Sequence, residues 1–240
     1  MRKILKSKGA MTGIETAIIL IAFVIVAASF AFVVLNMGFF TAQSSKTVIG
    51  SGLSEASSAI EIDGSVIAHG VPENYVGTLP SDLSEAVKSD LSTLLEDYEY
   101  GFAYKVVVYI KLSSGRQPVE LTRGKLVIAY TNPRVSIDNI YPEGTQNYLE
   151  DICKVEKVVG DDDMLLEEGE KFKIIINLGE LYAHFGEAAS LMGISYMTDK
   201  RDIFVGTHET FTIEVKPPVG AILTIERMIP PAIDYVMNLS

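Results

Sequence analysis

The chain has 240 residues, of which 48% are hydrophobic, and its mean hydropathy is +0.26. It carries 20 basic and 31 acidic side chains, so its formal net charge is −11. This acidity argues against a nucleic-acid-binding protein, which needs a basic face for phosphate groups. The single cysteine excludes an intrachain disulfide, and one long apolar segment is too few for a multi-span transporter.

The first 35 residues combine a basic cluster with that apolar segment. Residues 1–9 hold four basic side chains and no acidic one, and without them 16 basic residues face 31 acidic ones, a balance of −15. Residues 17–35 are apolar except for Ser29. A helix over this segment would be about 29 Å long, close to the ~30 Å hydrocarbon thickness of a bilayer. The basic cluster would stay on the cytoplasmic side and leave the bulk of the chain outside.

Three processing schemes fit this arrangement. A secretory signal would be cut after the apolar core, but the apolar run is longer than a usual signal core. A plain membrane anchor would not be cut at all. In the third scheme the leader ends at Lys8-Gly9, Ala10 becomes the first residue, and the apolar segment stays in the product.

Glu15 needs an explanation under each scheme, because residues 16–45 contain no charged side chain. A carboxylate at the edge of such a stretch is costly to bury without a partner. One explanation places it at the level of the lipid headgroups, near a helix N-terminus that favours negative charge. The other pairs it with the new α-amine of Ala10, about 7.5 Å away along a helix, in its own chain or in a neighbouring one.

The residues around this segment resemble the start of an archaellin, the archaeal flagellin that is made with a type IV pilin-like leader. The similar stretches are Lys6-Ser7-Lys8-Gly9, residues 10–23, Asn36-Met37-Gly38, residues 211–227 and, less closely, residues 103–131. One difference concerns the acidic residue, which is usually the fifth of the mature chain in related pilins. Glu15 would be the sixth residue after a cut that follows Gly9.

The resemblance implies a filament subunit that polymerises through its N-terminal helix, and the composition of the helix suits that role. A helix that is apolar on all sides belongs in lipid or among other apolar helices. Transfer from lipid to a bundle gains little from hydrophobicity, because both environments are dry. The predicted assembly residues are Glu15, Ile18, Ile19, Ile21, Phe23, Ile25, Phe30 and Phe32. The resemblance also implies a leader peptidase, a membrane platform protein and an assembly ATPase as partners.

Beyond the apolar run, spaced apolar residues at Val48, Ile49, Leu53, Ala56 and Ile60 predict that the helix continues. We therefore expect a leader over residues 1–9, a helix over residues 10–62 and an outer domain over residues 63–240.

The outer domain shows the period-two alternation of half-buried strands. The alternating stretches are residues 104–112, 125–130, 171–178, 211–215 and 223–226. Turn-forming clusters such as Asn132-Pro133 and Pro217-Pro218 separate them. Many short strands predict an antiparallel sandwich. The fold class is therefore α+β, a long apolar helix followed by a β-sandwich, which the resemblance makes immunoglobulin-like.

Residues 80–98 break the strand pattern and predict a helical insertion. Ser81 is placed to cap a helix whose apolar stripe runs from Leu83 to Tyr98. A second short helix is expected near residues 180–191.

Nothing in the sequence indicates catalysis or a cofactor. The three histidines are too far apart for a helical metal pair, and no phosphate loop or dinucleotide motif is present. Cys153 is expected to be a buried side chain that packs in the hydrophobic core. Asp161 and Asp163, in the densest acidic group, are weak candidates for calcium, but the group fits a solvated hairpin better. Asn238 heads the single glycosylation sequon, at the very end of the chain.

Together these features predict a structural, non-enzymatic subunit of an archaeal motility filament. It would form a homopolymer, with or without related archaellins, would lie outside the cell, and would have a membrane-inserted precursor. Two alternatives remain open: a non-rotating adhesion pilus, and a monomeric membrane-anchored binding domain.

Overall fold

The computed structural model describes residues 9–57, 59–73, 80–81, 83–90, 94–95, 97–98, 101–194 and 199–239. Within the first helix it describes the side chains of residues 13–50 and 52. The chain divides into two compact units, residues 1–53 and 54–240.

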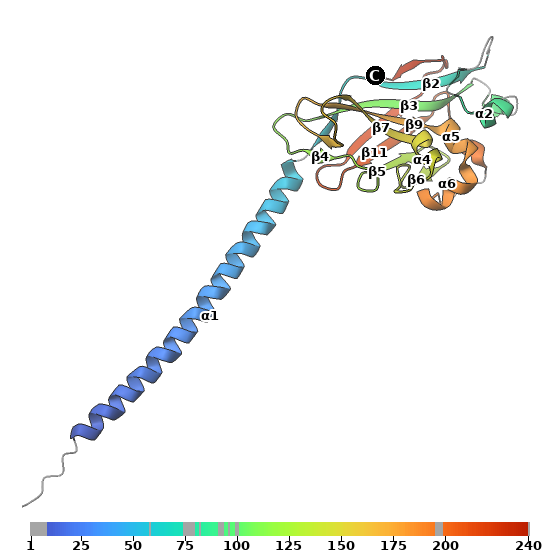
Figure 1. Ribbon diagram of the computed structural model, residues 1–240. Coiled ribbons are helices and arrows are strands. Elements are labelled where there is room, and N and C mark those ends of the chain that lie inside the picture. The colour runs from blue at the N-terminus through green and yellow to red at the C-terminus, as the bar shows by residue number, and fades with distance from the viewer. Residues whose placement is uncertain are drawn as a thin grey trace, which may run out of the picture. The chain divides into compact units, whose positions relative to one another are not determined.

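The first unit is formed by helix α1, Gly9–Ser57, whose last residues belong to the second unit; the helix is continuous over 49 residues (Figure 1). It contains no proline, and it passes through Gly38, Gly50 and Gly52 without a break. Each interior glycine costs a helix about 1 kcal/mol relative to alanine, so neighbouring residues must supply the helical preference. Gly50 and Gly52 could mark a bend by residue type, but the helix continues through both.

The predicted end of the helix at residue 62 is wrong. Helix α1 ends at Ser57, and strand β1, Ile60–Ile62, follows it. The strand pairs antiparallel with residues 110–112, and Ile60 is buried. The spacing of apolar residues up to Ile60 fitted a helical stripe, but the backbone pairing places this isoleucine in a sheet.

The second unit is built mainly from short antiparallel strands. The remaining strands are β2 Val66–Pro72, β3 Gly101–Leu112, β4 Val119–Glu120, β5 Val127–Thr131, β6 Ser136–Ile137, β7 Cys153–Val159, β8 Leu165–Leu166, β9 Lys171–Asn177, β10 Val205–Gly206, β11 Thr210–Lys216, β12 Leu223–Met228 and β13 Met237–Leu239. A seven-stranded sheet has the order β13-β2-β3-β9-β7, with β1 and β10 also paired to β3. A four-stranded sheet has the order β12-β11-β5-β6, and β4 pairs with β8.

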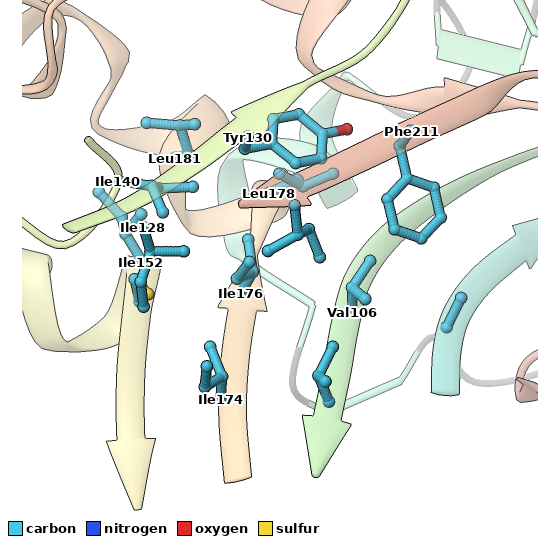
Figure 2. Close-up of a cluster of buried hydrophobic side chains, with 14 of the residues drawn as sticks. Val106, Ile128, Tyr130, Ile140, Ile152, Ile174, Ile176, Leu178, Leu181 and Phe211 are labelled. Atoms are coloured by element: carbon cyan, nitrogen blue, oxygen red, sulfur yellow. The ribbon is translucent and has the colours of Figure 1, made fainter. Parts of the chain in front are cut away.

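The two larger sheets share one hydrophobic core. In β3 and β9 the alternate residues paired as Val106 with Ile176 and Val108 with Ile174 are buried. Figure 2 shows Val106, Ile174 and Ile176 in one cluster with Tyr130 and Phe211 of the four-stranded sheet. Each fully buried side chain of this size contributes roughly 1.5–3 kcal/mol. The predicted antiparallel sandwich is therefore confirmed, whereas its description as immunoglobulin-like stays a prediction.

Short helices lie at one end of these sheets (Figure 1). They are α2 Glu85–Ser89, α4 Asn147–Ile152, α5 Leu178–Ala183, α6 Phe185–Met192 and the 3-10 helix η1 Lys200–Ile203. The expected helix near residues 180–191 is thus a pair, α5 and α6.

Within residues 80–98, predicted to form a helical insertion, the structure has the short helix α2, and its cap is not the predicted Ser81. The N-cap of α2 is Ser84, whose Oγ accepts a hydrogen bond from the backbone N–H of Val87 and donates one to the carbonyl oxygen of Gly179 in α5. Ser81 lies three residues earlier and is exposed. Of the predicted stripe, Leu83, Val87, Leu94 and Tyr98 are buried, whereas Leu91 lies outside the described residues.

A polar cluster connects the turn after β5 to the end of η1 and to Phe204. Asn132 is 6% exposed, and its Oδ1 accepts hydrogen bonds from the backbone N–H groups of Arg134 and Val135 at 2.9 and 2.8 Å. Its Nδ2 donates to the carbonyl oxygens of residues 202–204 at 2.9–3.2 Å. The neighbouring Arg134 forms an ion pair with Glu209 and donates to the Tyr98 hydroxyl.

Candidate assembly surface

The surface of α1 is apolar along most of its length. The large hydrophobic residues in the described part of the helix are between 55% and 74% exposed; Val33 is the least exposed of them and Phe40 the most. Seven of the eight predicted assembly residues lie on this surface, and the eighth, Glu15, is a charged residue before it. The seven are Ile18, Ile19, Ile21, Phe23, Ile25, Phe30 and Phe32. Their burial on assembly would stabilise a bundle by roughly 1.5–3 kcal/mol for each large side chain that leaves water.

This apolar surface surrounds the whole helix. The consecutive residues Ile18, Ile19, Leu20 and Ile21 are 62%, 69%, 63% and 58% exposed. Successive residues of an α-helix differ by about 100° around the axis, so these four side chains cover every direction. A helix of this kind has no polar face with which to lie on a soluble domain, so it must be enclosed by lipid or by other apolar helices.

Side-chain hydroxyls within the apolar surface are satisfied by the helix itself. Ser29 donates to the carbonyl oxygen of Ile25 at 2.8 Å, and Thr41 donates to that of Met37 at 2.8 Å. These bonds to the fourth preceding residue leave no unpaired donor to be desolvated. The single polar residue of the apolar run is therefore compatible with a dry environment.

A shallow apolar groove runs along the helix at Ser29. Ile25, Val26, Ser29, Phe30 and Val33 line it, and they belong to neighbouring i, i+4 rows. Grooves between such rows are the places where the side-chain ridges of a second helix pack. Because serine is small, a second helix can approach α1 closely at this point.

By length and composition, one helix of the described chain qualifies to cross a membrane. It covers Gly13–Gly50, 38 residues, and none of it is buried within the structure.

Glu15 is exposed and lies in the second turn of α1, because the helix begins at Gly9. The favourable effect of the helix dipole on a carboxylate fades beyond the first turn. The position therefore weakens the explanation that rests on the helix N-terminus.

The predicted leader falls largely outside the described residues, which do not include Lys8. Gly9 and Ala10 form the first residues of α1. The cleavage position stays a prediction.

The remaining sequence candidates lie in the outer domain. The Oδ1 atoms of Asp161 and Asp163 accept hydrogen bonds from the backbone N–H groups of Asp163 and Leu165, so both carboxylates shape the turn before β8. Among the described residues, no group of three or more His, Cys, Asp or Glu side chains could hold a metal ion. Asn238 is exposed in β13, and Ser240 of its sequon lies outside the described residues. Cys153 is fully buried, and this burial raises the pKa of its thiol to about 12.

Two features of the structure were not predicted from the sequence, namely Lys46 and the polar cluster around Asn132. Lys46 is the first charged residue after the uncharged residues 16–45, and its side chain is exposed on α1. The cluster around Asn132 and Arg134 joins residues about 70 positions apart, and no local pattern signals such a contact.

Comparisons with known proteins agree with this architecture. Archaeal-type flagellin is the family whose model matches, and the match spans residues 10–227. "Probable flagellin 2" of Archaeoglobus fulgidus is 30% identical over 96% of this chain and 94% of its own length. "Probable flagellin 1" of Aeropyrum pernix is 31% identical over 94% of each chain.

A solved structure is also similar, namely the archaeal flagellum of Methanospirillum hungatei strain JF1. It matches with a TM-score of 0.56 and 20% identity, over 95% of this chain and 99% of that one. At this identity the likeness concerns the fold, a long N-terminal helix followed by antiparallel sheets. The family model matches most of the sequence, and the two flagellins named above are 30% and 31% identical to this chain along nearly their whole length. The chain therefore belongs to the archaeal-type flagellin family.

Proposed function

We propose that this chain is the structural subunit of an archaeal motility filament and that α1 forms the core of the filament. The observation that carries the proposal is the continuous helix with an exposed apolar surface on every side. Membership of the archaeal-type flagellin family supports it, as does the fold shared with an archaeal flagellum.

Before assembly, the same apolar surface would be held in the cell membrane. Residues 17–35 match the hydrocarbon thickness, and the basic residues 1–9 would stay on the cytoplasmic side. Removal of the leader after Gly9 would discard four positive charges and free the helix to leave the membrane. The family match begins at Ala10, which supports this cleavage position. A leader peptidase, a membrane platform protein and an assembly ATPase would act on the chain at this stage.

After assembly, the subunits would form a homopolymer outside the cell. The outer domains would coat the apolar core, and rotation of the filament from its base would produce swimming.

The test is to shear filaments from cells that produce the chain and to determine its N-terminus by mass spectrometry. The expected result is filaments that contain this chain with Ala10 as its first residue. A chain that begins at Met1, or beyond residue 28, would contradict the proposed processing. Recovery of the chain only from membranes, as a monomer, would instead favour an anchored binding domain.

Swimming assays separate the two kinds of filament. Deletion of the gene should abolish motility if the filament rotates. Loss of surface attachment with intact motility would point to an adhesion pilus.

A further inference from the structure

Two charged side chains lie at the ends of the apolar part of α1. Between residues 13 and 50 the helix carries Glu15 and Lys46, with the uncharged residues 16–45 between them. Both side chains are exposed, and neither has an ion-pair partner among the described residues. A single negative and a single positive group thus frame the assembly surface.

Within one chain these two groups are too far apart to interact. They are 31 positions apart, which corresponds to about 46 Å along a helix at 1.5 Å per residue. Since α1 is continuous from Gly9 to Ser57, no bend brings them closer. Each group must therefore find its partner elsewhere when the helix enters a dry bundle, where an unpaired charge is costly.

The two charges also point in nearly opposite directions. At about 100° per residue, the side chains of Glu15 and Lys46 are about 140° apart around the helix axis. Two parallel neighbouring helices meet through opposite faces, one side of the first against the other side of the second. Lys46 of one chain can therefore face Glu15 of a parallel copy, provided that the copy is displaced along the axis.

We propose that Lys46 of one subunit forms an ion pair with Glu15 of a second copy of this chain, displaced by about 46 Å along the filament axis. The proposal rests on the filament function proposed above. The contact uses different patches on its two sides, so it repeats from copy to copy and produces an open filament rather than a closed ring.

The pair would set the axial register of the subunits. Apolar helices that are similar on all sides can slide past one another with little change in packing. Fixing register is the best-attested role of a buried polar or ionic pair among apolar helices. Because α1 offers a single group of each sign over residues 13–50, one displacement matches opposite charges.

The test is a charge exchange, read as the fraction of processed chain that is recovered in sheared filaments. Lys46→Glu and Glu15→Lys should each lower this fraction at least about tenfold, the factor that corresponds to 1.4 kcal/mol. The double variant, which restores opposite charges in exchanged positions, should recover to within about threefold of wild type, since three is well below that factor. As a matched control, Glu15→Lys is combined with Ser44→Glu, which adds the same acidic charge about 200° around the helix from Lys46. This control should not recover.

A neutral series covers the case in which reversed charges prevent membrane insertion. Glu15→Gln and Lys46→Gln should each reduce the filament fraction, and the double neutral variant should be no worse than either single variant. Additive losses in the double neutral variant would overturn the proposal, because they show that the two groups act independently.

The remaining outcomes separate this proposal from the proposed function. If Lys46 variants assemble normally while Glu15→Gln does not, Glu15 pairs with the α-amine of Ala10 and the proposed pair is wrong, although the filament function stands. If the wild-type chain yields no filaments, the proposed function fails and the pair fails with it.

Discussion

The change Asn132→Asp tests the polar cluster that connects the turn between β5 and β6 to the end of η1 and to Phe204. It is nearly isosteric and keeps Oδ1 as the acceptor for the backbone N–H groups of Arg134 and Val135. It removes both N–H donors of the amide, which in the wild-type chain donate hydrogen bonds to the carbonyl oxygens of residues 202–204. A carboxylate would then face these carbonyl oxygens in a site that is 6% exposed.

The expected loss of stability follows from the bonds that disappear. The carbonyl oxygen of Ile203 keeps the Tyr130 hydroxyl as a donor, and that of Phe204 keeps Arg134 and the Tyr98 hydroxyl. The carbonyl oxygen of Asp202 loses its donor, which costs about 1–3 kcal/mol. That is a sizeable part of the 5–15 kcal/mol typical of a domain. For a domain of this size the melting temperature should fall by at least about 2 °C.

The assay is thermal unfolding of the full chain in detergent, followed by near-ultraviolet circular dichroism of the tyrosines. All 11 tyrosines lie beyond residue 74, so the signal reports on the outer domain and not on α1. The matched control is Asn139→Asp, which makes the same change of charge. Asn139 accepts one bond from the backbone N–H of Tyr141 and is partly exposed, so its replacement should cost less than about 0.5 kcal/mol. Equal melting temperatures for the two variants would show that the hydrogen bonds donated by Asn132 do not stabilise the outer domain.

Three further predictions concern other parts of the chain. Ser84→Ala should destabilise the outer domain by about 1–2 kcal/mol in the same melting assay, whereas Ser81→Ala should have no effect; equal losses would contradict the assignment of the cap. Burial raises the pKa of Glu209, but hydrogen bonds from Arg134 and from the backbone N–H of Gly206 outweigh it, so the pKa of this carboxyl is lowered. The ionised Glu209 therefore stabilises the fold fully above its unfolded-state pKa, and this stabilisation is lost as the pH falls through its folded-state pKa. Between about pH 6 and pH 3 the melting temperature of the Glu209→Gln variant should fall less than that of the wild type. An equal fall in both proteins would contradict this. Ile21→Asp puts a charge in the middle of the apolar run, at a cost of about 2.5–3.5 kcal/mol, and should abolish incorporation into filaments, whereas Ile21→Leu should not; filaments built from the Asp variant would contradict the role of this surface.

Local patterns in the sequence were enough to predict α1 and the main strands. The apolar run from Ala17 to Leu35 and the alternation that starts at Phe172 depend on neighbours a few residues apart. Patterns of this kind survive folding because each side chain keeps the face that its backbone position gives it.

Features that depend on distant contacts were beyond such patterns. Ser81 and Ser84 are equally suitable caps by residue type, and the contact between Ser84 and Gly179, 95 positions later, accompanies the choice of Ser84. Ile60 fits a helical stripe as well as a strand, and its pairing with Leu112 decides between them. The apolar residues predicted for assembly are exposed on α1, and their role in assembly stays a prediction. The role proposed for Lys46 depends on the length and the rotation of the continuous helix together, which no local pattern shows.

Electron cryo-microscopy of filaments sheared from cells would show directly where α1 lies. We predict a core of parallel α1 helices, with Ile18 to Phe32 enclosed by neighbouring copies and the outer domains on the surface. A filament whose core is built from outer domains, with α1 exposed or absent, would contradict it.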